Sequence, residues 1–333
     1  MLHRILNTWR PAGFHYHHAL SGSDNVFEGW YLKCVDSQGR QPLAFIPGVF
    51  LGKDPHAFIQ VLDGAQGRSW YLRYEVSEFQ ASTDGFDVSI GPNRFSSHGL
   101  HLDIAAPDSS PPLVLHGSLE WGAWNPWPIT FFKPGCMGPY AFVPRMECNH
   151  GILSLDHAIS GTLHFNGSDV SYDGGRGYVE KDWGRSFPAA YVWVQSNHFD
   201  QSGICLTASV AKIPWWSGTF RGFLAAFLID GTLHPFTTYG GGRIRSLEIT
   251  ETHLHLRLEN RSHALEVNAE KAGGALLKAP YEKTMLERVA ETMTSTVEVC
   301  FSERGAAKPS YVGVGKHACM ELQGALRDIL GHD

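Results

Sequence analysis

The sequence predicts an all-β protein made of two tandem antiparallel units of the barrel or sandwich type, with at most short helices. Three observations support this. Runs of β-branched and aromatic residues follow one another at close spacing, Asn-Gly and Asp-Gly pairs stand between several of them, and no long amphipathic helix interrupts them. Asn-Gly and Asp-Gly readily take the positive φ angles of tight hairpins, which join antiparallel strands.

The first unit is expected to span residues 1–125. Turn signals such as Asp63-Gly64 and Asp84-Gly85 separate its strands. The predicted strands are 26–35, 43–46, 57–62, 69–76, 79–82, 86–90, 100–104 and 113–121.

Residues 126–150 differ from the rest because proline alternates with aromatic residues. The segment is too apolar for a solvated linker and too rich in proline for regular strands. It is therefore predicted to be a crossover packed between the two units, from which Tyr140, Glu147 and His150 are candidates to reach a site.

The second unit is expected to span residues 151–333. Its firmest hairpins turn at Asn166-Gly167 and Asp230-Gly231. Short helices are predicted at 286–292 and 324–330. The predicted strands are 152–165, 169–172, 178–183, 191–199, 220–229, 232–239, 245–249, 253–259, 264–269, 295–301 and 318–322.

Composition and charge argue against nucleic-acid binding, membrane-spanning helices and a metal site. The net charge is −6 and no dense Lys/Arg cluster occurs, which disfavours nucleic-acid binding. No apolar run approaches the roughly 18 residues of a membrane-spanning helix, so a cytoplasmic protein is expected, with peripheral membrane contact left open. The six cysteines form no Cys-x-x-Cys pair, and His15, His17 and His18 lack a further ligand in pattern, so no metal is expected.

Residues 178–199 carry more chemistry than any other segment. If 178–183 is a strand, Glu180 and Asp182 share one face, and Lys181 and Trp183 share the other. An equally good interpretation from spacing alone is a solvated strand end with surface ion pairs. In the following predicted strand, 191–199, aromatic and amide residues alternate in sequence with valines and therefore share one face. This face is typical of a pocket wall, and its residues are Tyr191, Trp193, Gln195 and Asn197.

A further carboxyl, Glu28, stands with Trp30 on an otherwise apolar strand face. It is either a strand-end residue that reaches water or a buried carboxyl with a raised pKa. The chain has no Gly-x-Ser-x-Gly, P-loop, dinucleotide fingerprint or His-Glu-x-x-His motif. Carboxyls among aromatic rings suit acid chemistry on an apolar substrate, because rings can stabilise a cation.

Four segments resemble the tocopherol cyclase family. They are Phe27-Glu-Gly-Trp-Tyr-Leu-Lys33, Ala44-Phe-Ile-Pro-Gly48, Glu180-Lys-Asp-Trp-Gly-Arg-Ser-Phe-Pro188 and Trp193-Val-Gln-Ser-Asn-His-Phe199. One departure is that Asp182 stands where the family block usually has asparagine. The resemblance implies a pair of lipocalin-like β-barrels and closure of a chromanol ring on a prenylated hydroquinone or similar isoprenoid, without a cofactor.

The resulting hypothesis is that a buried acid, Asp182 first and Glu180 or Glu28 next, protonates an alkene of the substrate. Trp30, Trp183 and Trp193 would flank the cation, and Tyr191, Gln195 or Asn197 would hold the phenol that captures it; Lys181, Tyr140 and Glu147 complete the predicted binding residues. If Lys181 faces the pocket instead, the donor is Glu28 or Glu147. Two alternatives stand beside this one: a non-catalytic lipid or isoprenoid carrier and a double-bond hydratase.

Overall fold

The computed structural model describes residues 7–20, 25–144, 146–215 and 218–330, and the chain divides into two compact units. The first contains Met1–Phe187 and Leu277–Glu287, and the second contains Pro188–Leu276 and Arg288–Asp333. The sequence placed the division at 150/151 instead. Residues 151–187 belong to the first unit because their two long strands pair with strands of the N-terminal sheet.

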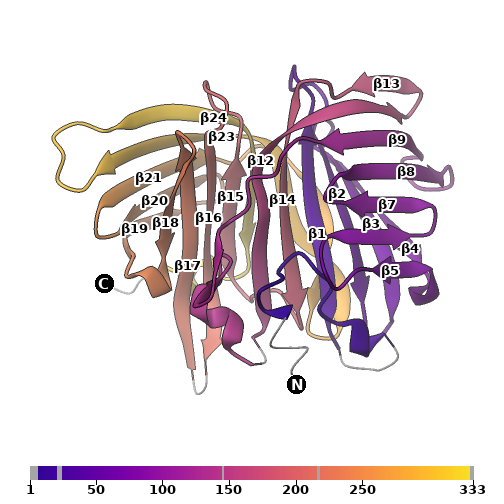
Figure 1. Cartoon of the computed structure of the whole chain (residues 1–333), viewed down its shortest axis with the longest axis horizontal. Coiled ribbons are helices and arrows are strands. Elements are labelled where there is room, and N and C mark those ends of the chain that lie inside the picture. Colours follow the sequence, from indigo (N-terminus) through magenta and orange to yellow (C-terminus); the bar gives the residue numbers. More distant parts are fainter. Residues whose placement is uncertain (1–6, 21–24, 145, 216–217, 331–333) are drawn as a thin grey trace. The chain divides into compact units, whose positions relative to one another are not determined.

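The first unit is one antiparallel sheet in the order β4-β3-β2-β1-β14-β12-β9-β8-β7-β6-β5, with β13 paired to β12 (Figure 1). Ile59 and Val88, near opposite ends of this order, pack in the same hydrophobic core, so the sheet curls around its own inner face. The strands are β1 (Phe27–Val35), β2 (Leu43–Phe50), β3 (His56–Asp63), β4 (Arg68–Tyr74), β5 (Phe79–Ala81), β6 (Asp87–Ile90), β7 (Asn93–Ser96), β8 (Gly99–Ala106), β9 (Leu113–Trp121), β12 (Cys148–Phe165), β13 (Ser168–Ser171) and β14 (Gly175–Gly184).

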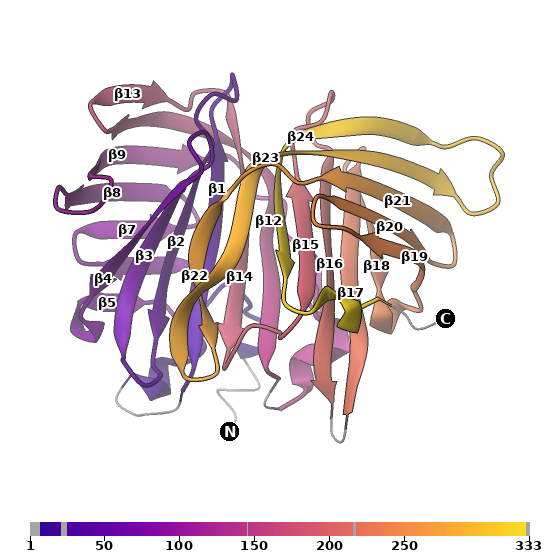
Figure 2. The same cartoon turned by 180° about the vertical axis from the view of Figure 1, so that it is seen from behind.

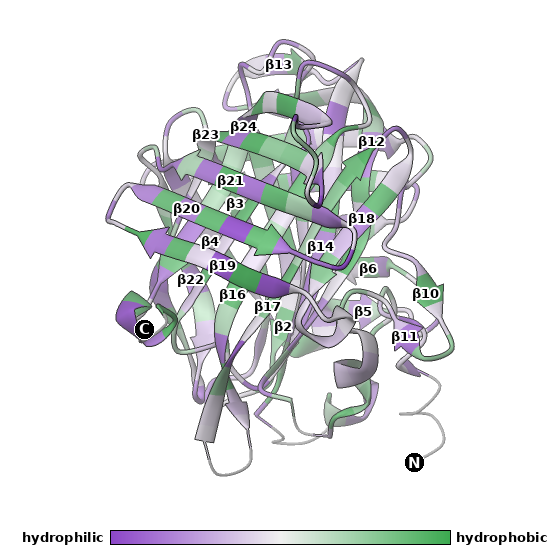
Figure 3. Ribbon diagram, turned by 90° about the vertical axis from the view of Figure 1, so that its left-hand side faces the viewer, coloured by the Kyte–Doolittle hydropathy of each residue, from purple (hydrophilic) through white to green (hydrophobic). Residues whose placement is uncertain are grey.

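The second unit holds the other large sheet, in the order β18-β17-β16-β15-β24-β23-β21-β20-β19, with β22 paired to β23 (Figure 2). Polar and apolar residues alternate along β20 and β21 (Figure 3), and the apolar ones other than Ala264 are buried. The strands are β15 (Tyr191–Ser196), β16 (Cys205–Trp215), β17 (Gly218–Ile229), β18 (Thr232–Thr237), β19 (Arg243–Ile249), β20 (His253–Glu259), β21 (His263–Glu270), β22 (Ala275–Tyr281), β23 (Thr284–Glu303) and β24 (Tyr311–Gln323).

Contacts of strand β22 explain why Leu277–Glu287 belongs to the first unit. Gln60 of β3 donates a hydrogen bond to the main-chain oxygen of Lys278 at 2.8 Å and accepts one from its main-chain nitrogen at 2.8 Å. The main-chain nitrogen of Phe187 donates to the oxygen of Pro280 at 3.0 Å.

Helices in the described residues are short 3-10 turns, and none is long and apolar enough to cross a membrane. The predicted helix at 286–292 is wrong, because these residues are part of strand β23; the one at 324–330 contains only a single 3-10 turn. The 3-10 helices are η1 (His17–Ala19), η2 (Val76–Glu78), η3 (Gly138–Phe142), η4 (Thr238–Gly240) and η5 (Leu326–Asp328).

Both firm hairpins are confirmed. Asn166 and Gly167 have φ angles of 48° and 90° between β12 and β13, and Asp230 and Gly231 have 51° and 69° between β17 and β18. The all-β prediction with two antiparallel units is likewise confirmed.

The proline-rich crossover departs from its prediction. It contains the small hairpin β10 (Ile129–Thr130) and β11 (Lys133–Pro134) followed by η3, and its last residues already belong to β12. Trp127 is buried as expected, but the rings of Phe131 and Phe132 are exposed.

Candidate active site

Strand β14 lies between β1 and β12 and presents different chemistry on its two faces. Glu180 and Asp182 lie on one face, while Lys181 and Trp183 lie on the other, as the period of a strand requires. Val179 shares the face of Lys181 and packs in the core of the first unit. The acidic pair therefore lies on the face of the sheet opposite to that core.

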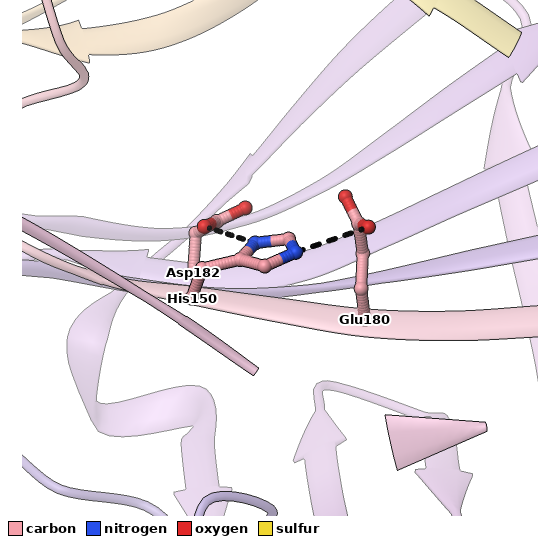
Figure 4. A group of neighbouring side chains, drawn as sticks. All are labelled: His150, Glu180 and Asp182. Carbon is pink, nitrogen blue, oxygen red and sulfur yellow. Dashed lines mark hydrogen bonds and ion pairs between the residues drawn. The ribbon is translucent and has the colours of Figure 1, made fainter. Parts of the chain in front are cut away.

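His150 joins the two acids from β12. Its Nδ1 is 2.9 Å from Asp182 Oδ1, and its Nε2 is 3.6 Å from Glu180 Oε2 (Figure 4). The β12–β14 register pairs His150 directly with Asp182, which fixes this approach. Because Asp182 accepts from Nδ1–H, the ring turns Nε2 toward Glu180.

The surroundings of the cluster are aromatic and largely buried. Tyr178 donates a hydrogen bond from its hydroxyl to Glu180 Oε2 at 2.5 Å. Tyr31 of β1 lies beside Glu180 in the register and is also buried. The side chains of His150, Glu180 and Asp182 are 15%, 8% and 23% exposed, so the cluster reaches solvent mainly at its Asp182 end.

Cys148 lies beside Asp182 at this end of the cluster. Its Sγ lies 3.8 Å from Asp182 Oδ1. Burial, reinforced by the nearby Asp182 carboxylate, raises the pKa of this thiol well above its usual value. Cys148 is therefore a neutral weak donor to Asp182 and not a thiolate nucleophile.

The same three side chains could also act as metal ligands. One ligand atom from each of His150, Glu180 and Asp182 lies within 4.8 Å of the others. The 2.9 Å contact is, however, a hydrogen-bond distance that already uses His150 Nδ1 and Asp182. The arrangement matches a carboxylate–imidazole–carboxylate proton relay at least as well as an ion site.

The opposite face of β14 holds a buried ion pair. Lys181 Nζ is 2.5 Å from Glu28 Oε1, and both side chains are fully buried. The ammonium also donates to the main-chain oxygens of Pro11 and Gly13 at 3.1 and 2.5 Å and to His15 Nδ1 at 2.8 Å.

The other half of this ion pair binds the same N-terminal segment. The Glu28 carboxylate accepts hydrogen bonds from the main-chain nitrogens of His15 and Tyr16, at distances between 2.9 and 3.2 Å. Together the two charged side chains fasten residues 11–16 to the inner face of the sheet.

Electrostatics make Glu28 an unsuitable acid. Burial alone would raise its pKa, but the Lys181 ammonium and His15 outweigh burial and hold the pKa below its ordinary value. Burial lowers the pKa of Lys181 to about 8, although Glu28 opposes this shift. Burial, followed by the Lys181 charge, lowers the pKa of His15, so its neutral ring accepts from Lys181 at Nδ1 and donates from Nε2 to the oxygen of Asn7 at 3.2 Å.

Two of the three tryptophans predicted to flank a substrate cation, Trp30 and Trp183, belong to this inner cluster, whereas the third, Trp193, lies on β15. The Lys181 ammonium lies 5.0 Å from the centroid of the Trp30 ring and 4.5 Å from that of Trp183. The His15 ring stacks on Trp183 at 4.5 Å. Glu28, Trp30, Lys181 and Trp183 thus form a structural cluster on the face that does not carry Glu180.

The predicted aromatic and amide wall lies in the second unit. Val192 and Val194 enter the core there, and Tyr191, Trp193 and Gln195 alternate with them along β15. The Tyr191 hydroxyl donates to Glu321 Oε2 at 2.6 Å, and Gln195 Nε2 lies 3.8 Å from the sulfur of Cys205. Asn197, just after β15, contacts His198 at 2.9 Å.

The last two predicted binding residues flank the start of β12. Tyr140 lies half-buried in η3. The main-chain oxygen of Glu147 accepts from the nitrogen of Arg185 at 2.8 Å, just beyond the end of β14.

The sequence indicated Glu180 and Asp182 as candidate acids but did not predict which side chains surround them. His150 was only a candidate to approach the site, and Tyr31 and Tyr178 were not chosen. The signal for Tyr178 was its parity with Glu180 along one strand. His150 had no such signal, because only the pairing of β12 with β14 brings it there.

A separate depression of about 350 Å³ lies over β5–β7 of the first unit. Its lining includes the ion pair of Arg94 with Asp87 at 2.9 Å, so it is polar and does not suit an apolar substrate. The lining residues are Gln80, Ala81, Ser82, Asp87, Ser89 and Arg94.

Solved structures share the lipocalin-like fold of this chain. CghA in complex with Sch210972 matches with a TM-score of 0.58 at 10% identity, over 92% of this chain and 90% of that one. A putative AttH from Nitrosomonas europaea matches at 0.53 and 15% identity, over 94% of both chains. Kievitone hydratase from Nectria haematococca matches at 0.51 and 10% identity, over 97% of this chain and 93% of that one.

Sequence comparison goes beyond the fold. A probable chloroplastic tocopherol cyclase of Oryza sativa subsp. japonica is 27% identical over 322 residues, which cover 81% of this chain and 67% of that protein. The family model described as tocopherol cyclase-like matches residues 127–322, more than half of the chain and all of β12, β14 and β15. The chain therefore belongs to the tocopherol cyclase-like family.

Proposed function

We propose that this protein is an enzyme that closes an oxygen-containing ring on a prenylated hydroquinone or a similar isoprenoid phenol, by protonating an alkene of the substrate. Membership of the tocopherol cyclase-like family supports the substrate class. The observation that carries the chemistry is the Asp182–His150–Glu180 cluster with the Tyr178 hydroxyl on Glu180.

The proposed reaction is an isomerisation. A proton from the enzyme adds to one alkene carbon and leaves a tertiary cation at the other. The phenol oxygen then bonds to that cation and releases its proton to the enzyme. One C–H and one C–O bond form, the alkene π bond and the O–H bond break, and no electrons enter or leave.

We assign the first proton to Glu180. Its side chain is 8% exposed, against 23% for Asp182, and it lies beside the buried rings of Tyr31 and Tyr178. His150 is placed to return a proton through Nε2, and Asp182 orients His150 by accepting from Nδ1. The predicted order of the two acids is thereby reversed: Asp182 becomes a positioning residue.

Two tyrosines replace the tryptophans as partners for the cation. Tyr31 and Tyr178 are buried beside Glu180 on the same face. An aromatic face stabilises a nearby cation by about 0.5–2 kcal/mol. The role once predicted for Trp30 and Trp183 thus passes to rings that the substrate could reach from the side of the acids.

Conservative variants separate these roles. Glu180→Gln is expected to lower turnover of a prenylated hydroquinone by about 100-fold or more, the usual contribution of a positioned acid. Asp182→Asn keeps an oxygen that accepts from His150 Nδ1 and is expected to stay within about tenfold of the natural protein, whereas Asp182→Ala falls further. Near-normal turnover by Glu180→Gln, with Asp182→Asn inactive, would return the donor role to Asp182.

A hydratase shares the first step and is the second candidate. Asp182 and His150 are 23% and 15% exposed, so water can approach this end of the cluster. Capture of the cation by water instead of phenol would add one oxygen from solvent. Mass spectrometry of the product formed in ¹⁸O-labelled water distinguishes the two reactions, and recovery of a bound, unchanged lipid after long incubation would favour a carrier.

A further inference from the structure

The hairpin β10–β11 carries aromatic residues where polar ones are expected. Thr130 and Lys133 pair across it, so Phe131 and Phe132 form its two-residue turn. Such turns usually hold Gly, Asn, Asp or Pro, because these residues suit the backbone and face water. The two rings are 71% and 76% exposed, so packing within the described chain does not account for them.

The two rings belong to a larger apolar surface on the first unit. Ile129 and Phe142 are 46% and 44% exposed. Trp9 stacks on Phe131 at 5.6 Å, meets the edge of Phe142 at 5.3 Å, and donates from Nε1 to the main-chain oxygen of Phe131 at 3.1 Å. We call Trp9, Ile129, Phe131, Phe132 and Phe142 the aromatic patch, and Figure 3 shows the β10–β11 hairpin that carries three of these residues.

The charge around the aromatic patch differs from that of the whole chain. Acidic residues make up 33 of the 333, yet residues 1–23 and 121–146, the two segments that supply the patch, contain no Asp or Glu. Their cations include Lys133 at the base of the hairpin and Arg10, which pairs with Asp84. The two segments that supply the patch therefore carry only basic charged residues, and the acid beside them, Asp84, is paired with Arg10, so the patch suits an anionic apolar interface better than the chain's net charge of −6 suggests.

We propose that the aromatic patch docks this protein on the surface of an anionic lipid bilayer, with Phe131 and Phe132 inserted among the headgroups. Tryptophan and other aromatic side chains favour this interfacial depth. A contact between two copies fits less well. The exposed side chains of the aromatic patch offer on the order of 500 Å² of surface for burial, whereas a stable dimer buries about 800 Å² per partner.

Vesicle sedimentation of the full chain tests this. The protein should pellet with vesicles of phosphatidylcholine and phosphatidylglycerol, less with phosphatidylcholine alone, and less at high salt. Phe131→Ser/Phe132→Ser should weaken binding at least tenfold, since burial of one phenylalanine corresponds to about that factor. The matched control is Val312→Ser/Val314→Ser, which replaces two residues of β24 that are 65% and 45% exposed and should leave binding unchanged.

Three results would overturn the proposal. They are no binding to either vesicle, equal binding by Phe131→Ser/Phe132→Ser with an unchanged thermal transition, and a dimer that this variant splits without any change in vesicle binding. The vesicle assay does not depend on turnover, so it can fail or succeed separately from the proposed cyclisation. A soluble short-chain substrate should be turned over equally by the variant and the natural protein.

Discussion

Glu28→Gln should destabilise the first unit without removing catalysis. The substitution keeps the size of the side chain but leaves the fully buried Lys181 ammonium without its counter-ion. Removing one partner of a buried pair costs about 3–5 kcal/mol. Lys181 keeps three neutral acceptors, from Pro11, Gly13 and His15, so the lower end, about 3 kcal/mol, is expected.

Thermal and urea unfolding measure this loss. At about 2–4 °C per kcal/mol for a unit of this size, the midpoint should fall by roughly 6–12 °C. Glu120→Gln, at an exposed position of β9, is the control and should change stability by less than about 0.5 kcal/mol. Glu28→Leu/Lys181→Met removes both charges and should recover most of the stability, because a buried pair is often replaceable by apolar residues.

The same variant decides between a structural and a catalytic Glu28. Turnover per folded molecule should stay close to that of the natural protein, since Glu28 lies on the face of the sheet opposite to Glu180. Unchanged unfolding together with lost turnover would refute this reasoning. The proton donor would then have to be sought on the inner face.

Two further predictions follow from the same strand. Gly184→Ala would place a Cβ 2.2 Å from the main-chain oxygen of Glu147 and should cost about 1–3 kcal/mol in urea unfolding, whereas Gly85→Ala, where nothing lies within 4 Å, should be nearly neutral. The pKa of Lys181 is lowered to about 8 in the folded protein, so the unfolded chain binds this proton more tightly. The free energy of unfolding should therefore rise with pH from about 8 toward 10, by up to about 3 kcal/mol. Lys181→Met should abolish this rise, and a rise that persists in the variant would contradict the prediction.

The two-residue period of a strand was enough to predict how the site residues within β14 are distributed between its two faces. The two-residue period placed Glu180 and Asp182 on one face and Lys181 on the other, as the structure has them. It could not tell which face was the core. For Glu28 the sequence allowed either a strand-end residue that reaches water or a buried carboxyl with a raised pKa, but despite burial its ion pair with Lys181 lowers that pKa, which fits neither alternative.

Long-range pairing supplied what periodicity could not. His150 enters the site only because β12 pairs with β14, and the same pairing moves the unit boundary beyond residue 150. The helix predicted at 286–292 was wrong for a related reason. Its short apolar spacing fits a helix as well as a strand, and its place in β23, which pairs with both β22 and β24, decides the outcome.

The two faces of β14 have different roles: the inner face contributes to stability, and the opposite face carries the proposed catalytic residues. On the inner face, Lys181 and Glu28 bind the N-terminal segment, and on both edges β1 and β12 fix the backbone through their ladders. Glu180 and Asp182 are therefore positioned by a backbone held from elsewhere, so their side chains can remain committed to His150 and the substrate. Substitutions at these two positions should accordingly change turnover far more than stability, and the opposite should hold for Lys181.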